Sequence, residues 1–253
     1  MRTALGVDLG ATWLRACLAD GREELWTAKV PAAGWRELPK LLARILHTRG
    51  LRRVGTLTVG GTRLGGADDR ATLRRALAPL ARRVMVVTDF ELAHLAAFGR
   101  EPGVILVAST GSVAFARGAG GRSKRSGGLG PLLGDEGSGF WLGREALRDP
   151  VLSRSLPSAL TLAHSCDPVR ATAALAPRVL RRSRRLREAA AEHLAALART
   201  AASGLPMTGP KPLALHGSLF KDDALRASLV RRLGKNWVLV APRVSAERAA
   251  AGL

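Results

Sequence analysis

The sequence predicts an α/β protein in which mixed β-sheets carry helices on their faces. An apolar run enters a small turn containing Gly and Thr and a second apolar run leaves it, once within residues 3–18 and again within residues 104–116. Each repeat is typical of two strands joined by a tight turn. Because Gly10 and Gly111, one from each turn, lie 101 positions apart, we interpret the chain as a distant internal duplication.

The first half of the chain is expected to continue as alternating helices and strands. Pro31 precedes and Gly50 follows a helical pattern, as is usual at helix ends. Apolar residues at helical spacing indicate a further helix at 69–81, and the short apolar run at 84–88 indicates a buried strand. The expected strands are residues 3–9, 12–19, 24–30, 53–59 and 84–88, and the expected helices are residues 36–49, 69–81 and 90–99.

The second half restarts this pattern with a hairpin at residues 103–117. Residues 118–128 combine glycines with basic residues and are expected to form a flexible loop. The expected strands after it are residues 213–215 and 237–240, and the expected helices are residues 138–148, 169–176, 179–203, 218–233 and a short one within 246–253. The length of 253 residues allows two small domains with cores of their own, which we place at 1–102 and 103–253.

Composition favours a reducing, cytoplasmic location. Cys17 and Cys166 are isolated thiols, a pattern that argues against a disulfide scaffold and supplies no four-cysteine metal site. No basic leader precedes an uncharged apolar stretch at the N-terminus, so we expect no signal peptide. The longest uncharged stretch, residues 102–116, is too short to span a bilayer, so we expect no membrane partner.

The net charge of +20 raises the hypothesis of a nucleic-acid partner. However, the basic residues are mostly Arg with only six Lys, and the chain has one Asn and no Gln, which GC-rich codon usage explains more simply. The densest cluster, Arg178 to Arg187, has six Arg in ten residues and no interleaved aromatic side chain. We interpret it as a solvated helix face and expect no nucleic-acid partner.

The two turns are candidate phosphate sites. Glycines leave backbone N–H groups accessible, and Thr and Ser hydroxyls add donors, so two such turns could bind the phosphates of a nucleotide. Gly10 and Thr12 belong to the first turn, and Thr110, Gly111 and Ser112 to the second. The chain has no P-loop, no nucleophile elbow and no His-Glu-x-x-His zinc helix.

Carboxylates stand beside these turns. Asp8 ends a strand, where it could hold hydrated Mg²⁺ against phosphate or bond its own backbone. Asp89 follows a buried strand, where it could accept a proton from a hydroxyl or cap the next helix. Asp135 and Glu136 lie between glycines before a helix, where they could interact with the positive end of that helix or position a hydroxyl or a metal.

Together, these motifs resemble the N-acetylglucosamine kinase and BadF/BadG/BcrA/BcrD-type ATPase family, within the superfamily of sugar kinases, heat-shock chaperones and actin. The stretch at residues 128–147, which contains Gly-Asp-Glu-Gly-Ser, is similar to the family's most specific segment. The segments at 87–89 and 108–112 are similar to its catalytic strand and second phosphate loop, and 216–220 to its adenosine loop. The similarity runs in order from about residue 3 to residue 245.

The resemblance implies two ribonuclease-H-like domains of actin-like ATPase type, the second with a reduced helical insertion, and ATP with Mg²⁺ in a cleft between them. It implies that Asp89 is the catalytic base on the acceptor hydroxyl and that Asp8 organises the metal. The remaining implied roles are nucleotide binding by Gly10, Thr12, Thr110, Gly111, Ser112, Gly217 and Ser218, and lining of the acceptor site by Gly127, Gly128 and Asp135.

The function expected from this set is an ATP-dependent kinase that phosphorylates a hydroxyl of an amino sugar such as N-acetylglucosamine or glucosamine. Two alternatives stay open: an ATPase that drives a partner protein, and a nucleotide-binding regulatory protein without kinase activity. The second is motivated by residues 30–35, which lack the Asn that sugar-kinase members place there. The acceptor is expected to be a small molecule, and a homodimer is left open.

Overall fold

The computed structural model describes residues 3–10, 13–32, 34–62 and 64–252, and its contacts divide the chain into two compact units. Unit 1 comprises residues 1–99 and 242–253, and unit 2 comprises residues 100–241. This division differs from the expected one at the C-terminal segment, which the sequence analysis assigned to the second domain. The segment belongs with unit 1 because its helix packs against the first strand.

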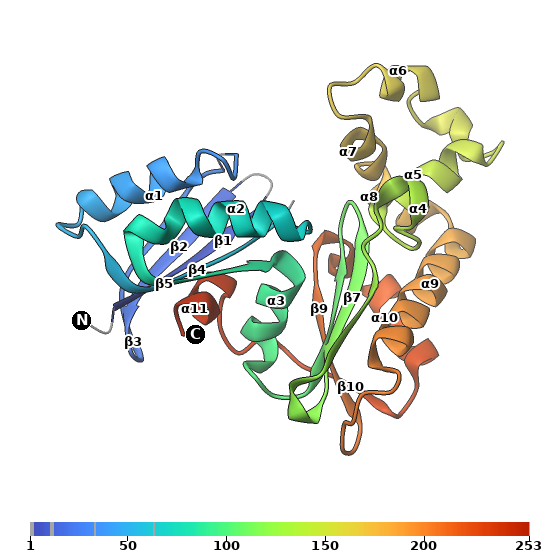
Figure 1. Ribbon diagram of the computed structural model, residues 1–253. Coiled ribbons are helices and arrows are strands. Elements are labelled where there is room, and N and C mark those ends of the chain that lie inside the picture. The colour runs from blue at the N-terminus through green and yellow to red at the C-terminus, as the bar shows by residue number, and fades with distance from the viewer. Residues whose placement is uncertain (1–2, 11–12, 33, 63, 253) are drawn as a thin grey trace. The chain divides into compact units, whose positions relative to one another are not determined.

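Unit 1 is built on a five-stranded mixed sheet (Figure 1). Its strands are β1 (Thr3–Leu9), β2 (Trp13–Asp20), β3 (Glu23–Pro31), β4 (Val54–Gly61) and β5 (Ala81–Thr88). Their order across the sheet is β3-β2-β1-β4-β5, with β1, β4 and β5 parallel and the β1–β2 and β2–β3 pairs antiparallel. The parallel strands therefore bring their carboxyl ends to one edge of the sheet.

Helices cover both faces of this sheet (Figure 1). The face that carries Leu5 and Val7 forms a core with α1 (Leu38–His47) and α2 (Ala67–Leu77). The opposite face packs on α3 (Asp89–Phe98) and α11 (Ala246–Ala251). On that face a Cβ at Gly6 would lie 2.0 Å from the carbonyl oxygen of Glu247, so only glycine lets α11 approach β1 this closely.

Unit 2 repeats the topology with a second five-stranded sheet. Its strands are β6 (Gly103–Ala108), β7 (Ser112–Arg117), β8 (Ser123–Gly127), β9 (Lys211–His216) and β10 (Trp237–Leu239). The strand order is β10-β9-β6-β7-β8, which corresponds to the order in unit 1 when the sheet is read from its opposite edge. The β6–β7 and β7–β8 pairs are antiparallel, and the β6–β9 and β9–β10 pairs are parallel. The predicted duplication is thus visible in the strand order, and the predicted α/β class with helix-flanked mixed sheets is confirmed.

The helices of unit 2 are α4 (Gly130–Leu133), α5 (Gly139–Arg148), α6 (Ala159–Ala163), α7 (Pro168–Ala173), α8 (Ala176–Arg182), α9 (Arg184–Ala202) and α10 (Asp223–Leu233). Of these, the alanine-rich α9 packs directly on β6, β7 and β8, and α5 and α10 pack against α9. The core under them joins Leu106 and Ala114 of the sheet to Leu142, Leu194 and Leu225 of the helices. The small side chains of α9 let this helix lie close to the strands.

Three local expectations were wrong. Residues 118–128 contain a 3₁₀ turn and strand β8 rather than a flexible loop, because Ser123–Gly127 pairs with β7. The helix expected at 179–203 is interrupted at Ser183, whose hydroxyl accepts the N–H of Leu186 and begins α9. The helix expected at 218–233 begins as a 3₁₀ turn and restarts at Asp222, which caps α10. No helix in the described residues is both long and apolar enough to cross a bilayer.

Candidate nucleotide and acceptor site

The turn between β6 and β7 is held by the start of α5. The backbone N–H groups of Gly139 and Phe140 donate to the carbonyl oxygens of Ser109 and Thr110 at 2.7 and 3.0 Å. Within the described residues, the N–H groups of Thr110 and Gly111 donate no hydrogen bond. The turn therefore has its carbonyls anchored in the protein and two N–H donors left for a ligand, as expected of a phosphate-binding turn.

Asp135 is buried against this turn. Its side chain lies so close to Gly111 that a Cβ there would be 2.8 Å from both carboxylate oxygens, and the N–H of Ser112 donates to its Oδ1 at 3.2 Å. Burial raises the pKa of Asp135, and the nearby Glu136 raises it further, while the hydrogen bond from Ser112 lowers it. Its backbone has a φ of 64°, an uncommon conformation for a residue other than glycine.

Ser112 ties the acidic segment to the turn. Its hydroxyl donates to the carbonyl oxygen of Glu136 at 2.8 Å, and its own carbonyl accepts the N–H of Gly128 at 2.9 Å. The structure thus brings Asp135, Gly127 and Gly128 close to the turn, whereas their lining of an acceptor site stays a prediction. It also commits the Ser112 hydroxyl to the main chain, so this side chain supports the turn rather than offering a donor to phosphate.

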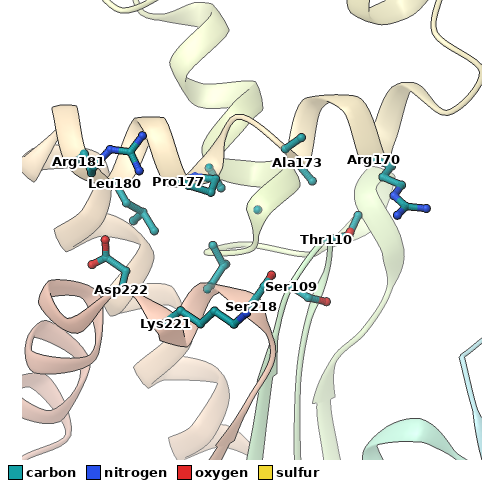
Figure 2. Close-up of a pocket in the computed structure, with 14 residues that line it drawn as sticks. Ser109, Thr110, Arg170, Ala173, Pro177, Leu180, Arg181, Ser218, Lys221 and Asp222 are labelled. Atoms are coloured by element: carbon teal, nitrogen blue, oxygen red, sulfur yellow. The ribbon is translucent and has the colours of Figure 1, made fainter. Parts of the chain in front are cut away.

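A cavity of about 560 Å³ opens beside the same turn. Residues from the turn, α7, α8 and the segment after β9 line it (Figure 2). Figure 2 shows Ala173, Pro177 and Leu180 opposite Ser218 and Lys221, so the cavity is a slot with a largely apolar upper wall. An aromatic ring bound between these walls would be sheltered from water on both faces.

Ser218 forms part of the lower border of the slot, and Gly217 precedes it. Gly217 has a φ of 113°, and a Cβ at this position would lie 2.2 Å from the carbonyl oxygen of Ala108. Glycine is therefore required where the chain leaves β9 and passes the end of β6. This geometry presents Ser218 to the slot and places the predicted adenosine loop next to the predicted phosphate turn.

Charged side chains stand at both ends of the slot. Figure 2 shows Arg170 near Thr110 at one end and Arg181 with Asp222 at the other. Arg170, Arg181 and Lys221 form no ion pair within the described part of the chain, whereas Asp222 accepts the N–H of Leu225 at 2.8 Å. The slot can therefore attract an anionic ligand without first breaking salt bridges.

In unit 1, Asp8 and Asp89 lie at the same edge of the sheet. In the strand register, Asp8 of β1 is the partner of Gly60 of β4. Gly61, which follows Gly60, is the partner of Thr88 of β5, and Asp89 directly follows Thr88. Because neighbouring strands are about 4.8 Å apart, β1 and β5 are about 10 Å apart across β4.

Asp89 is the first residue of α3, but it is not the helix cap. Thr88 caps α3, since its hydroxyl accepts the N–H of Glu91 and the Glu91 carboxylate accepts the N–H of Thr88 at 2.8 Å. Asp89 Oδ1 accepts the N–H of Phe90 at 3.0 Å. Thr88, and not Asp89, is therefore the N-cap of α3. The Asp89 carboxylate lies at the positive end of this helix.

Asp8 faces Arg15 across the β1–β2 pair. A guanidinium nitrogen of Arg15 lies 3.3 Å from Asp8 Oδ2. The N–H of Gly10 donates to the carbonyl of Trp13 at 3.0 Å, so this donor closes the turn. Thr12, the other residue expected to contact phosphate in this turn, lies outside the described residues.

No three His, Cys, Asp or Glu side chains gather into a metal-binding group in the described ranges. A single carboxylate such as Asp8 still fits Mg²⁺, because this ion keeps most of its waters and binds proteins through one or two carboxylates together with nucleotide phosphates. The donor set therefore suits a metal that arrives with a nucleotide rather than one that resides in the protein.

Several residues of these sites were missed by the sequence analysis. Arg15 falls in an ordinary strand pattern, and its proximity to Asp8 follows from the hairpin register. The slot wall formed by α7 and α8 had no motif, and Arg181 belongs to the cluster that was interpreted as a solvated face. The contact between Arg15 and Asp8 could have been predicted from the register of the expected hairpin. No sequence pattern predicts that α7 and α8 line the slot.

Comparison with known proteins identifies the family of the chain and a curated relative. Residues 5–247 match the BadF/BadG/BcrA/BcrD ATPase family. The N-acetylmuramic acid/N-acetylglucosamine kinase of Clostridium acetobutylicum is 28% identical over 167 residues, which cover 60% of this chain and 55% of that enzyme. The alignment thus spans about half the length of this curated relative.

Solved structures share the fold over nearly the whole chain. A candidate N-acetylglucosamine kinase from Chromobacterium violaceum superposes with a TM-score of 0.78 at 25% identity, covering 99% of this chain and 98% of that one. A second candidate from Porphyromonas gingivalis has a TM-score of 0.69 at 21% identity, with coverages of 97% and 96%. The ROK hexokinase of Thermus thermophilus has a TM-score of 0.60 at 22% identity, with coverages of 99% and 96%. The last two likenesses show the fold alone.

Proposed function

Because the chain belongs to the BadF/BadG/BcrA/BcrD ATPase family, we propose that it is an ATP-dependent sugar kinase. The proposed reaction transfers the γ-phosphoryl group of ATP to a hydroxyl of an amino sugar such as N-acetylglucosamine or glucosamine. The alignment with the N-acetylmuramic acid/N-acetylglucosamine kinase supports the choice of an amino sugar. The likeness to the Chromobacterium violaceum structure over nearly its whole length supports it further.

The observation that carries the proposal is that the slot in unit 2 opens directly onto the turn between β6 and β7. Pro177 and Leu180 supply an apolar wall for the adenine ring, and Ser218 borders the place expected for the ribose. The slot ends at Ser109 and Thr110, beside the two N–H donors of the turn. A nucleotide has this same order of an aromatic base, a sugar and an anionic chain.

Asp89 supplies the base in the proposed reaction. The acceptor hydroxyl oxygen forms a bond to the γ-phosphorus, the bond from that phosphorus to the bridging oxygen breaks, and ADP leaves with the electron pair. The hydroxyl proton passes to the Asp89 carboxylate. Because phosphoryl transfer has a loose transition state, most of the rate enhancement comes from position and electrostatics, and a positioned base adds to it.

Asp8 is the residue proposed to hold Mg²⁺ that accompanies ATP. When bound, the metal would neutralise phosphate charge and orient the terminal phosphoryl group. Asp8 suits this role because it projects from a strand end beside a turn and has a side chain that is about one fifth exposed. We assign no role in metal binding to the other carboxylates of the chain.

The cysteines do not favour the alternative of a partner-driving ATPase that carries a metal cluster. Cys17 is fully buried and its thiol donates to Glu24, and burial raises its pKa to about 11, so it is a poor thiolate ligand. Cys166 is exposed. Within the described residues, neither thiol belongs to a group of three or more His, Cys, Asp or Glu side chains that could hold a metal.

A coupled ADP-release assay tests the proposal. ATP and Mg²⁺ would be supplied with N-acetylglucosamine, N-acetylmuramic acid, glucosamine, N-acetylmannosamine, glucose or no acceptor. We expect ADP release to be stimulated by at least one amino sugar, with a phosphorylated sugar detected by mass spectrometry. Equally slow ADP release in every reaction, with no phosphorylated sugar, would contradict the proposal.

A further inference from the structure

Strand β5 forms one edge of the unit 1 sheet. It is the last strand in the order β3-β2-β1-β4-β5, and no strand of the described residues pairs with its other side. Such an edge is usually protected by charges, proline or a bulge, because its unpaired N–H and C=O groups can bind another extended chain. In β5 only Arg82 and Arg83 are charged, and the run from Val84 to Val87 is apolar and partly exposed. The second half of this edge is therefore open to an added strand.

A groove lies between this edge and α2. It has a volume of about 380 Å³, and it is lined by Ala67, Arg70, Ala71 and Arg74 of α2 and by Val84 to Val87 of β5. Val84 and Val86 pack against the core that contains α1 and α2, so their side chains lie on the helix-covered face. Arg82 lies on the same face, because alternate residues of a strand point the same way. The groove is thus an apolar strip with basic side chains along it.

The arginines beside the groove have donors to spare. Arg74 and Arg82 form no hydrogen bond or ion pair within the described ranges. Arg70 donates through Nη1 to the carbonyl oxygens of Leu64 and Gly65, both at 2.7 Å, which fixes this side chain beside the groove. No carboxylate of the described residues lines the groove. Because a guanidinium group can bind a carboxylate through two parallel hydrogen bonds, the groove favours an acidic occupant.

The spacing of the arginines on α2 matches that of an extended chain. Arg70 and Arg74 are four residues apart in one helix, so they lie about 6 Å apart along its axis. Alternate residues of a strand lie about 6.7 Å apart and face the same side. Since β4 and β5 are parallel, α2 must run back along the strands between them. Two alternate side chains of a strand added to β5 would therefore lie opposite Arg70 and Arg74.

We propose that the β5 edge binds an extended segment of a partner protein that carries Asp or Glu at alternate positions. The segment pairs its main chain with β5 and directs its carboxylates to Arg70 and Arg74. A second copy of this chain suits the groove less well, because antiparallel pairing of β5 with itself would bring the α2 arginines of both copies together. The net charge of +20 also opposes self-association. The inference concerns unit 1 alone and does not depend on the proposed kinase function.

Fluorescence anisotropy with labelled peptides tests the proposal. One probe alternates Glu and Val. A second probe has the same composition but places all Glu before all Val, and a third is the alternating peptide with every amide N-methylated. Each probe would be titrated with the wild type, Arg74→Glu and the control Arg75→Glu. Arg75 is the exposed neighbour of Arg74 on α2 and lies outside the groove, so both variants change the net charge equally.

We expect the wild type to bind the alternating peptide at least about tenfold more tightly than the other two, because only this peptide offers both the spacing and the main-chain donors. Arg74→Glu should bind it about 10- to 100-fold more weakly, the range expected when a charge-assisted contact becomes a repulsion. Arg75→Glu should stay within about threefold of the wild type, and both variants should melt at the wild-type temperature.

Four results would overturn the inference. No binding of the alternating peptide would show that the edge does not accept such a segment. Equal affinity for the alternating and block peptides, or an equal loss in the two variants, would indicate attraction to the net charge alone. Undiminished binding of the N-methylated peptide would exclude strand pairing. A wild-type dimer in sedimentation velocity that the alternating peptide dissociates would show that a second copy, and not a partner protein, occupies the edge.

Discussion

The carboxylate of Asp135 and the backbone of Gly111 are in direct contact, although 24 positions separate them in the sequence. A Cβ at Gly111 would lie 2.8 Å from both Asp135 oxygens, closer than side-chain carbons ordinarily approach. The adjacent Ser112 N–H donates to the same carboxylate. The phosphate turn and the acidic segment of unit 2 therefore form one structural unit, and a change in either one should affect the other.

Substitution of Gly111 by Ala tests this contact. The added methyl group should displace the Asp135 carboxylate and destabilise the protein by about 1–3 kcal/mol, the usual cost of overpacking. The matched control is Gly65→Ala, because a Cβ at Gly65 would have no atom within 4 Å. Chemical denaturation of both variants measures the effect. Equal denaturation midpoints for the two variants would show that the close packing at Gly111 is unimportant.

The pH dependence of stability should change in Asp135→Asn. Burial raises the pKa of Asp135, so the protonated carboxyl stabilises the folded protein relative to the ionised one. This stabilisation is fully present below the pKa that Asp135 has in the unfolded state, and it is lost as pH rises through its pKa in the folded state. Asn is neutral at every pH, can still accept the Ser112 N–H, and tolerates a positive φ. The variant should therefore melt at a higher temperature than the wild type at pH 7, and the gain should shrink towards pH 4. A gain of the same size at both pH values would argue against a buried charge as its cause.

Filling the slot should abolish nucleotide binding without unfolding the protein. Ala174 lines the cavity and is exposed, so Ala174→Trp adds an indole at the mouth of the slot at little cost to the core. We expect the Kd for ATP to rise at least about tenfold, since the adenine would lose its apolar contacts. Ala163→Trp, at an exposed alanine of α6 outside the slot, is the control and should bind like the wild type. Undiminished ATP affinity in Ala174→Trp would place the nucleotide elsewhere.

Local sequence patterns were sufficient to predict much of the fold. The apolar runs around Gly10 and Gly111 indicated two related hairpins, and the two sheets have the same strand order. By contrast, β8 was missed because Lys124 and Arg125 give it a polar, exposed composition, and its pairing with β7 is what makes it a strand. Composition alone carries no information about such a pairing.

The candidate site was predictable only where a motif is contiguous. Thr110, Gly111 and Ser112 are adjacent in the chain, but their contact with Asp135 depends on tertiary packing. The slot wall at Pro177 and Leu180 is brought to Ser218 from a distant part of the sequence, and no local pattern marks it. Arg15 was missed because its contact with Asp8 depends on the register of the β1–β2 hairpin rather than on a local motif.

The most direct test of the central claim is the acceptor-dependent turnover of Asp89→Asn. The substitution keeps an oxygen that can accept the Phe90 N–H but removes the carboxylate that would take the hydroxyl proton. Asp68→Asn, in the exposed first turn of α2, is the matched control. With the sugar that stimulates the wild type, kcat of Asp89→Asn should fall about 10²- to 10⁴-fold, while its Kd for ATP and the kcat of the control stay unchanged. Wild-type kcat in Asp89→Asn would contradict the assignment of Asp89 as the base and, with it, the proposed mechanism.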